Sequence, residues 1–429
     1  MGRFPFISTE PEPEKAVLVG VDMAGGAWTV DRSLDELERL AATAGAMVVG
    51  RLTQRLDRPV PRSFIGSGKV MELCSMTRSL GADVVIFDDD LSPAQQAHLE
   101  KQVGESVKII DRTALILDIF GLHAKTREGR LQVQLAQLQY LLPRLRGMWS
   151  HLAKEQTRGG IGSRFGQGES QLEVDRRMIR KRISQLRLEL RELDKRRAVQ
   201  SKGRASSPAF RVALAGYTNA GKSTLLNRLT GSCVLSEDKL FATLDPTTRS
   251  YVLPGGRVMT VTDTVGFIQK LPHGLVEAFK STLSEVLGAD LILKVVDVGD
   301  EDRLLHMEAV DSVLDEIGAG ERDAITVYNK IDMLDPVELA GMKAREPDAV
   351  FFSALTGEGT KDLAERIARE AAAKDRLVSA LLPYSEGALL KLIREQGSVI
   401  DLEYVSEGTR VVCKVPPRIA ALMEPYLRD

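Results

Sequence analysis

The chain has 429 residues, of which 43% are hydrophobic and 28% are charged, and its formal net charge is −2. This length holds two to four domains, and the composition is that of a soluble globular protein. No run of 18 apolar residues is present and the first residues lack the apolar core of a signal peptide, which argues against a membrane or exported protein. We expect a cytoplasmic monomer, with a peripheral position at a membrane as the second option.

Charge is distributed unevenly, because residues 125–204 hold 20 Lys and Arg against 8 Asp and Glu. A basic segment on an acidic body predicts an anionic partner, nucleic acid first, whereas the plainer interpretation is a solvated helix face. The three cysteines stand far apart and in no metal-binding spacing. They are expected to be reduced thiols in protein cores: Cys74, Cys233 and Cys413.

The first hundred residues alternate short apolar runs with amphipathic stretches. We predict strands at residues 16–21, 46–50, 83–87 and 107–110, and helices at 33–44, 69–80 and 93–104. Such alternation predicts βαβ units and a small parallel sheet. The segment Gly66–Lys69 has part of a phosphate-loop pattern, but its spacing is incomplete, so a helix that begins after glycine is the better interpretation.

The next segment is predicted to be helical. Apolar residues recur at intervals of three and four in two stretches, which predicts two helices whose apolar seams face each other. The seams are Leu131, Leu135, Leu138, Leu142 and Leu145, and Ile179, Ile183, Leu186, Leu190 and Leu193. Five of the ten residues Gly159–Gly168 are glycines, which end a helix. We predict an antiparallel hairpin with a glycine-rich tip, arms about 40 Å long and a kink at Pro143.

A linker is predicted at residues 202–208, and strand–helix alternation returns after it, with strands at 211–215, 258–262, 291–297, 324–328 and 350–353. The last residues have one helical pattern, at 387–396, between strand-like runs. The predicted fold class is α/β, with a small parallel α/β domain, a long antiparallel helical hairpin, a P-loop domain and a small C-terminal α+β domain. Their expected bounds are 1–112, 113–203, 204–375 and 376–429.

A phosphate-binding loop follows the first strand of the P-loop domain. Its residues fit G-x-x-x-x-G-K-[ST] between a strand and a helix: Gly216, Tyr217, Thr218, Asn219, Ala220, Gly221, Lys222, Ser223 and Thr224. The N–H groups of such a loop bind phosphate oxygens, helped by the N-terminus of the next helix. We expect Lys222 to reach the β- and γ-phosphates as a catalytic residue, and the Ser223 hydroxyl to bind Mg²⁺.

Three further segments follow predicted strands: Asp263-Thr264-Val265-Gly266, Asn329-Lys330-Ile331-Asp332 and Ser353-Ala354-Leu355. The Asp263 carboxylate can hold Mg²⁺ through water, and the Gly266 N–H can face the γ-phosphate, a catalytic role. The Asp332 carboxylate can accept from N1–H and the exocyclic amine of guanine, whereas adenine offers no matching donor. The third segment can support the base through its backbone. These motifs, in this order, favour GTP over ATP.

The chain also resembles the HflX family of bacterial translational GTPases over almost its whole length. The segments Asp111–Arg127, Gln139–Arg146 and Glu169–Arg176 are similar to family signatures, although Phe165 and Gln167 depart from the glycine and proline of the family's tip. The family's first switch is matched by Phe241-Ala242-Thr243-Leu244-Asp245-Pro246-Thr247-Thr248-Arg249. The resemblance implies that Thr243 binds Mg²⁺ and is catalytic, whereas the residues alone left Thr243, Thr247 and Thr248 open.

The resemblance also implies a function. Members of the family bind the large ribosomal subunit, and in several bacteria they split stalled or idle ribosomes under stress, hydrolysing GTP to reset the switch. The basic hairpin would then enter a site walled by ribosomal RNA. The alternatives are a GTP-dependent partner in RNA modification and an RNA remodeller with a second nucleotide site in the N-terminal domain.

Two residues bear on hydrolysis. Phe267 stands where Ras-like enzymes have the glutamine that orients the attacking water, so slow intrinsic hydrolysis is expected. Asn219 is a candidate to hold K⁺, which would lend positive charge to the reaction. The alternative role of Asn219 is to brace the first switch by a hydrogen bond.

Overall fold

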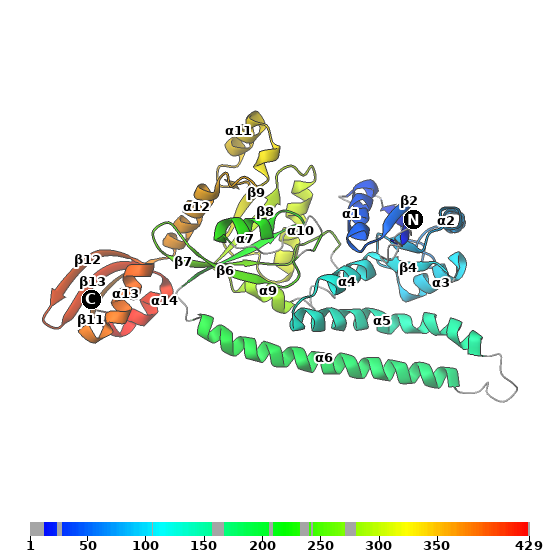
Figure 1. Cartoon of the computed structure of the whole chain (residues 1–429), viewed down its shortest axis with the longest axis horizontal. Helices are drawn as coiled ribbons and strands as arrows, with labels where there is room; N and C mark the ends of the chain where they lie inside the picture. Colours follow the sequence, from blue (N-terminus) through cyan, green and yellow to red (C-terminus); the bar gives the residue numbers. More distant parts are fainter. Residues whose placement is uncertain are drawn as a thin grey trace, which may run out of the picture. The chain divides into compact units, whose positions relative to one another are not determined.

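The computed structural model describes residues 13–23, 28–104, 106–156, 167–205, 209–231, 240–241, 243–270 and 280–427 (Figure 1). The chain forms two compact units, residues 1–190 with 270–278, and residues 191–269 with 279–429. Most of the expected glycine-rich tip lies outside the described residues, as do Cys233 and Ala242. Within the described part, no helix is both long and apolar enough to cross a membrane.

A parallel sheet of four strands forms the core of the first unit, in the order β2-β1-β3-β4. The strands are β1 (Lys15–Met23), β2 (Met47–Leu56), β3 (Val84–Phe87) and β4 (Lys108–Asp111), and the helices between them are α1 (Val30–Thr43), α2 (Ser67–Leu80) and α3 (Pro93–Val103). The predicted alternation is confirmed, and Gly66 is the residue before α2. The prediction that the second strand ends at Gly50 is wrong, because the mostly polar residues up to Leu56 continue to pair with β1.

Three helices complete the described part of this region: α4 (Arg112–His123), α5 (Arg127–Gln156) and α6 (Gln167–Ala205). The sequence did not predict α4, because most of its apolar residues are buried in an almost continuous run rather than along one stripe. Helices α5 and α6 are antiparallel, since Arg127 pairs with Glu189 at 3.6 Å and Arg182 donates to Gln134 at 2.9 Å.

The apolar seam of the hairpin is confirmed by its buried members, which are Leu131, Leu135, Leu145, Ile183 and Leu186. Helix α5 continues on both sides of Pro143. Helix α6 is longer than the expected arm and reaches Ala205, so the prediction that a linker begins at Lys202 is wrong. The charged residues of this segment favour a helix, and their effect exceeds that of Ser201 and Gly203 near its end.

The second unit contains a sheet of six strands in the order β10-β9-β8-β5-β7-β6. Five strands are parallel, namely β5 (Phe210–Gly216), β7 (Val258–Asp263), β8 (Leu291–Asp297), β9 (Ala324–Asn329) and β10 (Val350–Phe351). The sequence did not predict β6 (Thr247–Val252), an edge strand antiparallel to β7, because it is largely exposed and polar. Helices of this region are α7 (Lys222–Thr230), α9 (Lys280–Leu287), α10 (Arg303–Glu316), α11 (Pro336–Arg345) and α12 (Thr360–Ala373).

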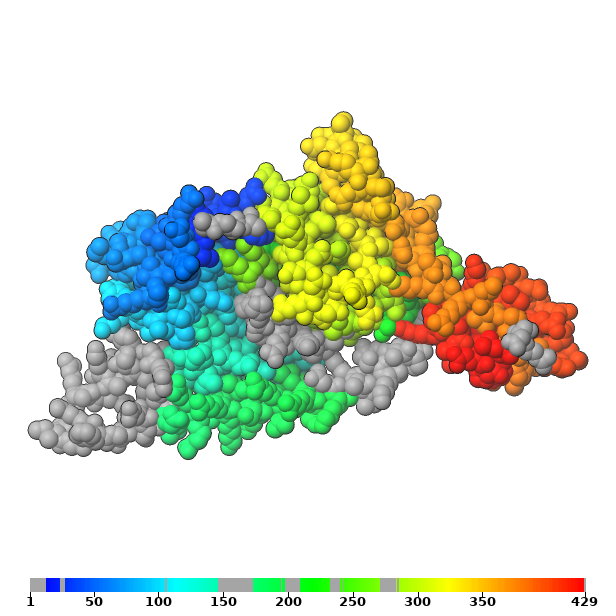
Figure 2. Space-filling model, turned by 180° about the vertical axis from the view of Figure 1, so that it is seen from behind, coloured from blue at the N-terminus to red at the C-terminus, as the bar shows by residue number. Residues whose placement is uncertain are grey.

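A smaller antiparallel sheet follows, in the order β11-β13-β12, and Figure 2 shows its residues as a red lobe. Its elements are β11 (Arg376–Leu382), α13 (Gly387–Gln396), β12 (Ser398–Val405), β13 (Gly408–Val415) and α14 (Pro417–Met423). Cys413 is a free thiol in the core of this sheet, where burial raises its pKa to about 11. Cys74 is also free and packs against the first core. Both observations agree with the expected reduced thiols.

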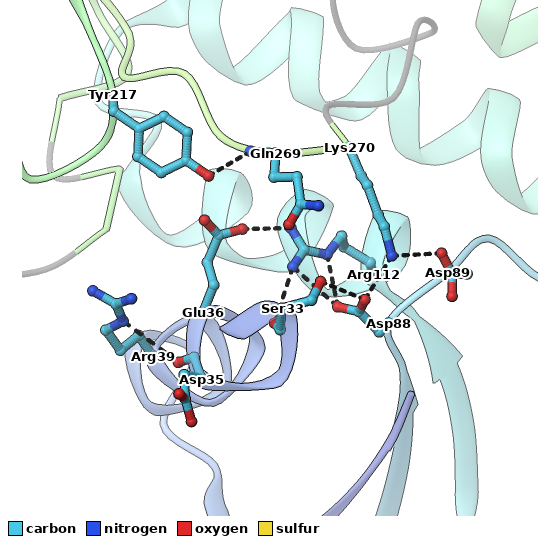
Figure 3. Close-up of polar contacts among 10 residues, drawn as sticks. All are labelled: Ser33, Asp35, Glu36, Arg39, Asp88, Asp89, Arg112, Tyr217, Gln269 and Lys270. Atoms are coloured by element: carbon cyan, nitrogen blue, oxygen red, sulfur yellow. Dashed lines mark hydrogen bonds and ion pairs between the residues drawn. The ribbon is translucent and has the colours of Figure 1, made fainter. Parts of the chain in front are cut away.

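A cluster of charged side chains is buried in the first unit (Figure 3). The guanidinium of Arg112, with a side chain that is 1% exposed, lies 2.6 Å from Glu36 and 3.0 Å from Asp88. Asp88 also accepts from the Ser33 hydroxyl at 2.6 Å and pairs with Lys270 at 2.6 Å. Burial pushes the pKa of Asp88 upward, but the charges of Arg112 and Lys270 outweigh it and the pKa is lowered. The cluster therefore favours the ionised carboxylate.

Candidate nucleotide-binding site

The phosphate loop lies between β5 and α7, as predicted. The backbone at Gly216, Asn219 and Gly221 has the conformation or the close packing that a loop around an anion requires. Asn219 and Gly221 have positive φ, at 61° and 87°. A Cβ on Gly216 would lie 2.3 Å from the carbonyl oxygen of Val295 in β8, so only glycine fits there. Thr224 lies in the first turn of α7, whose N-terminus faces the loop.

Lys222 is directed back into the loop. Its side chain donates to the carbonyls of Gly216 at 3.0 Å and Tyr217 at 2.7 Å, and the residue is 6% exposed. Burial lowers the pKa of Lys222 to about 8, while the Asp263 carboxylate acts in the opposite direction. A buried ammonium held by only two carbonyls is suited to an anionic partner such as a phosphate.

Three oxygen-bearing side chains meet beside the loop. The Ser223 hydroxyl lies 2.8 Å from the Thr243 hydroxyl and donates to Asp263 Oδ2 at 2.6 Å. Asp263 is fully buried, and its Oδ1 has no hydrogen-bond partner among the described residues. Burial raises the pKa of Asp263, against the effect of Lys222 and of the two hydroxyls. Hard oxygen donors with one unsatisfied buried oxygen fit Mg²⁺, which takes few protein ligands and keeps waters and phosphates.

The structure thus brings Thr243 to the predicted place. Thr248 instead lies in β6, where its hydroxyl contacts that of Thr262 at 2.9 Å, and Thr247 begins the same strand. Of the other predicted residues of the first switch, Phe241 and Leu244 are buried and Asp245 is half-buried. Among the described residues, no group of three or more His, Cys, Asp or Glu could hold a metal ion.

The segment that follows β7 packs directly on the phosphate loop. Phe267 donates its N–H to Gly216 at 3.1 Å and accepts from the N–H of Thr218 at 2.8 Å. A Cβ on Gly266 would lie 2.9 Å from Thr218 Cα and 3.1 Å from Lys222 Nζ. The absence of a side chain at Gly266 therefore allows the two segments to approach each other, as expected for a glycine next to the γ-phosphate position.

The sequence did not predict that Tyr217 contributes to the contact between the phosphate loop and the segment after β7. Its hydroxyl accepts from the backbone N–H of Gln269 at 2.7 Å (Figure 3), and its ring stacks on His306 of α10 with a centroid distance of 3.8 Å. Tyr217 occupies a position of the motif that tolerates any residue, so the motif carried no signal for it. Phe267 is 1% exposed and presents no polar group, as expected.

The residues predicted to recognise the base also come together. Asn329 donates to the Ala220 carbonyl at 2.9 Å and accepts from the Ala354 N–H at 2.9 Å, which joins the phosphate loop to the loop after β10. The Ser353 hydroxyl donates to Asp332 at 2.5 Å and orients that carboxylate. Lys330 has a φ of 67° and pairs with Asp297 at 2.6 Å.

The remaining predicted members lie beside these groups. Ile331 is buried next to Asp332, Val265 and Thr264 are buried beside Asp263, and Leu355 is 75% exposed at the end of the third segment. Thr264 donates its hydroxyl to the Leu214 carbonyl at 2.6 Å, which ties the end of β7 to β5. Apart from Ala242, all the predicted site residues belong to the described part and lie in or beside these loops.

Comparison with known proteins agrees with this site. Family models match residues 31–121 as "GTP-binding GTPase N-terminal", 123–204 as "GTP-binding GTPase Middle Region" and 211–330 as "50S ribosome-binding GTPase". The chain is 46% identical over 412 residues to a GTPase HflX of Caldanaerobacter subterraneus, covering 95% of this chain and 93% of that protein. It is 42% identical to GTPase HflX of Magnetococcus marinus, with 97% and 96% covered.

The protein of the same name from Escherichia coli is 41% identical, with 94% of this chain and 93% of that protein covered. The sequence similarity therefore covers the four-stranded sheet, the helical hairpin, the six-stranded sheet and the nucleotide-binding loops. With a nucleotide site of this geometry and relatives of this identity over nearly the whole length, the chain belongs to the HflX family of GTPases.

Proposed function

We propose that this GTPase binds the large ribosomal subunit through its basic helical hairpin and splits or rescues stalled or idle ribosomes, with GTP hydrolysis resetting the switch. The observation that carries the proposal is the family match, because the model for residues 211–330 is described as that of a "50S ribosome-binding GTPase". The charge of residues 125–204, with 20 basic and 8 acidic residues, supports it independently.

The described part of α6 presents cations to solvent. Arg177, Arg180 and Lys181 are exposed, whereas Ile183 and Leu186 are buried. Exposed Lys and Arg along one helix suit the phosphates of RNA, which supply most of the affinity of non-specific nucleic-acid binding. The ion pair of Arg180 with Glu173 is exposed and long, at 4.0 Å, so exchanging it for a contact with RNA would cost little stability.

Within the nucleotide site, we assign roles by the chemistry of each group. Lys222 and the N–H groups of Gly216–Thr224 bind the phosphates, Ser223 and Thr243 bind Mg²⁺, and Asp263 holds it through water. When bound, Mg²⁺ neutralises charge on the phosphate oxygens. Gly266 directs its N–H at the γ-phosphate, and Asp332 accepts from the guanine edge.

The test is subunit splitting, followed by light scattering of 70S ribosomes with GTP. Changing Arg177, Arg180 and Lys181 to glutamate should weaken binding of large subunits, and the loss should be larger at low salt than at high salt. The matched control changes Lys361 and Lys391, whose exposed side chains lie on α12 and α13, and should split normally. If the variant with three changes on α6 splits ribosomes as well as the control with changes at Lys361 and Lys391, the hairpin does not bind the ribosome through these cations.

A second arm of the test removes residues 159–168. This deletion should leave GDP binding unchanged but abolish splitting, since no residue of the nucleotide site is removed. We propose that the tip is the part of the hairpin that acts on the ribosome, and normal splitting by the deletion variant would contradict this role. The rival function, a GTP-dependent partner in RNA modification, predicts binding to free RNA without any change in 70S scattering. The expected monomer and the cytoplasmic location remain predictions.

A further inference from the structure

One arginine outside the nucleotide-binding motifs holds the loop that we assign to the guanine base. Arg228 lies in the last turn of α7, the helix that begins with the phosphate loop. Its Nε donates to the Ala354 carbonyl at 3.1 Å, and its Nη2 donates to the Leu355 carbonyl. The planar fork of one guanidinium therefore binds two successive carbonyls of the loop after β10.

The same loop is held on its other side by Asn329. The Ala354 N–H donates to Asn329 Oδ1, and the Ala354 carbonyl accepts from Arg228, so both polar groups of this residue have partners. In a trans peptide the C=O and the following N–H point in opposite directions. With its carbonyls turned toward Arg228, the loop must direct the N–H groups of Leu355 and Thr356 away from the arginine.

Gly357 and Ser353 are compatible with the contact between Arg228 and the two carbonyls. Gly357 has a φ of 88°, and a Cβ on it would lie 3.3 Å from the Cζ atom of Arg228, so a side chain there would crowd the guanidinium. The Thr356 N–H donates to the Ser353 hydroxyl at 3.1 Å, and that hydroxyl donates in turn to Asp332. The orientation of the loop is thus connected to the carboxylate that we assign to guanine.

We propose that Arg228 is a positioning residue for base specificity: it fixes the loop so that the N–H of Leu355, and not a carbonyl, faces the oxygen at position 6 of guanine, since the N–H groups of Ala354 and Thr356 already bond Asn329 and Ser353. That oxygen is an acceptor, so an N–H attracts it and a carbonyl repels it. Adenine has an amine at the same position and would gain from the opposite orientation. The inference rests on the proposed roles of Asp332 and the loop, which the experiment tests separately.

The experiment measures binding of three diphosphates to the full chain with Mg²⁺. They are GDP, inosine diphosphate, which lacks only the 2-amino group, and 2-aminopurine riboside diphosphate, which lacks the oxygen at position 6 and the proton on N1. The missing N1 proton weakens the aminopurine nucleotide equally in wild type and in the Arg228 variants, so only the change in preference is compared. Arg228→Ala should weaken GDP and inosine diphosphate about tenfold, as expected for lost charge-assisted hydrogen bonds, and the aminopurine nucleotide by about twofold or less. The preference for GDP over the aminopurine nucleotide should therefore fall by about fivefold or more.

Two further variants make the result interpretable. Arg228→Lys should give an intermediate loss, because one ammonium cannot reproduce the two-pronged contact. Arg345→Ala, which removes an arginine that bonds only the Gly341 carbonyl of its own helix α11 among the described residues, should change neither affinity nor preference. Thermal unfolding of each variant shows whether the fold is kept. Equal weakening of all three nucleotides by both Arg228 variants would overturn the proposal and leave a structural role.

Asp332→Asn separates this inference from the proposed site. It should lower the preference for GDP over inosine diphosphate, because the carboxylate is assigned to the 2-amino group. If this preference is unchanged, the assignment of the base site itself is wrong. If it changes while Arg228→Ala keeps the wild-type preference for GDP over the aminopurine nucleotide, only the inference about Arg228 is wrong.

Discussion

The side-chain amide of Asn329 lies where a side chain on Gly221 would begin. A Cβ on Gly221 would be 2.2 Å from Asn329 Nδ2, far inside van der Waals contact. The same amide donates to the carbonyl of Ala220 at 2.9 Å. Glycine at position 221 is therefore required by the Asn329 side chain, in addition to its own φ of 87°. Asn329 also bonds the loop that we assign to the base.

We expect Gly221→Ala to abolish GDP binding, because the added methyl group displaces Asn329 and with it the links to Ala220 and Ala354. The left-handed backbone alone would cost about 1–2 kcal/mol of stability. The control is Gly231→Ala at the other end of α7, where φ is 64° and nothing lies within 4 Å of the added atom. This control should lose similar stability but bind GDP normally, as measured by calorimetry; near-normal binding by Gly221→Ala would refute the argument.

Sequence reasoning was most reliable where a motif prescribes backbone geometry. The phosphate loop, Asp263 and the pair of Asn329 and Asp332 stand at strand ends, so their assembly at one edge of a parallel sheet could be predicted. Arg228 could not, because an arginine in the last turn of a helix usually faces water. Its partners are the carbonyls of Ala354 and Leu355, more than a hundred residues away, and backbone acceptors leave no pattern in the sequence.

Two elements of the fold, α4 and β6, could not be predicted from the sequence for a similar reason. Helix α4 is too apolar to show a stripe, and β6 is too polar to show alternation, so each is defined by its tertiary partners. The buried cluster around Arg112 was also missed, since its members come from positions as far apart as Glu36 and Lys270. Single charged residues in a sequence do not reveal which of them are buried.

Base recognition is tested by Asp332→Asn. The amide keeps one acceptor but replaces a carboxylate oxygen with a donor, which meets the donors of guanine unfavourably. We expect weaker GDP binding and a gain for xanthosine diphosphate, whose additional oxygen at position 2 accepts from the new amide. Competition binding of the two nucleotides measures the change. Unchanged affinity for GDP would show that Asp332 does not contact the base.

Stability of the first unit should depend on Asp88. Asp88→Asn removes the charge that faces Arg112 and Lys270, and losing one partner of a buried ion pair typically costs about 3–5 kcal/mol. Urea unfolding, followed by hydrogen exchange of β1 and β3, measures the loss. The control is Asp35→Asn, whose carboxylate pairs with Arg51 at the surface and should change stability little. Equal effects of the two changes would contradict the importance of burial.

The pH dependence of this effect has a defined sign. The pKa of Asp88 is lowered in the folded protein, so its stabilising contribution is fully present above the ordinary carboxyl pKa of 3.8. The contribution is lost as the pH falls from that value through the lowered pKa. The difference in stability between wild type and Asp88→Asn should therefore be constant near neutral pH and shrink below about pH 4. A difference that grows with acidification would contradict the lowered pKa.

Phe267 bears on how the attacking water is activated. Phe267 is buried, and its backbone N–H and carbonyl are both bonded to the phosphate loop, so this residue presents nothing that could orient a nucleophile. We expect slow GTP turnover by the free protein and faster turnover with large ribosomal subunits, which would supply the missing group. Fast turnover by the free protein would show that the site is complete without a glutamine.

A bound ion is the second expected means of completing the site, and Asn219 is the residue that we expect to hold it. Asn219 is exposed on the phosphate loop with a φ of 61°, close to where a cation could neutralise charge between the β- and γ-phosphates. If Asn219 holds K⁺, turnover at equal ionic strength should be several-fold faster in K⁺ than in Na⁺, and Asn219→Ala should remove the difference while GDP still binds. If Asn219 only braces the first switch, both salts will give equal rates in the wild type, and Asn219→Ala will slow both equally. Single-turnover hydrolysis with and without large subunits distinguishes the two roles, because a bound ion acts on the chemical step whether or not the ribosome is present.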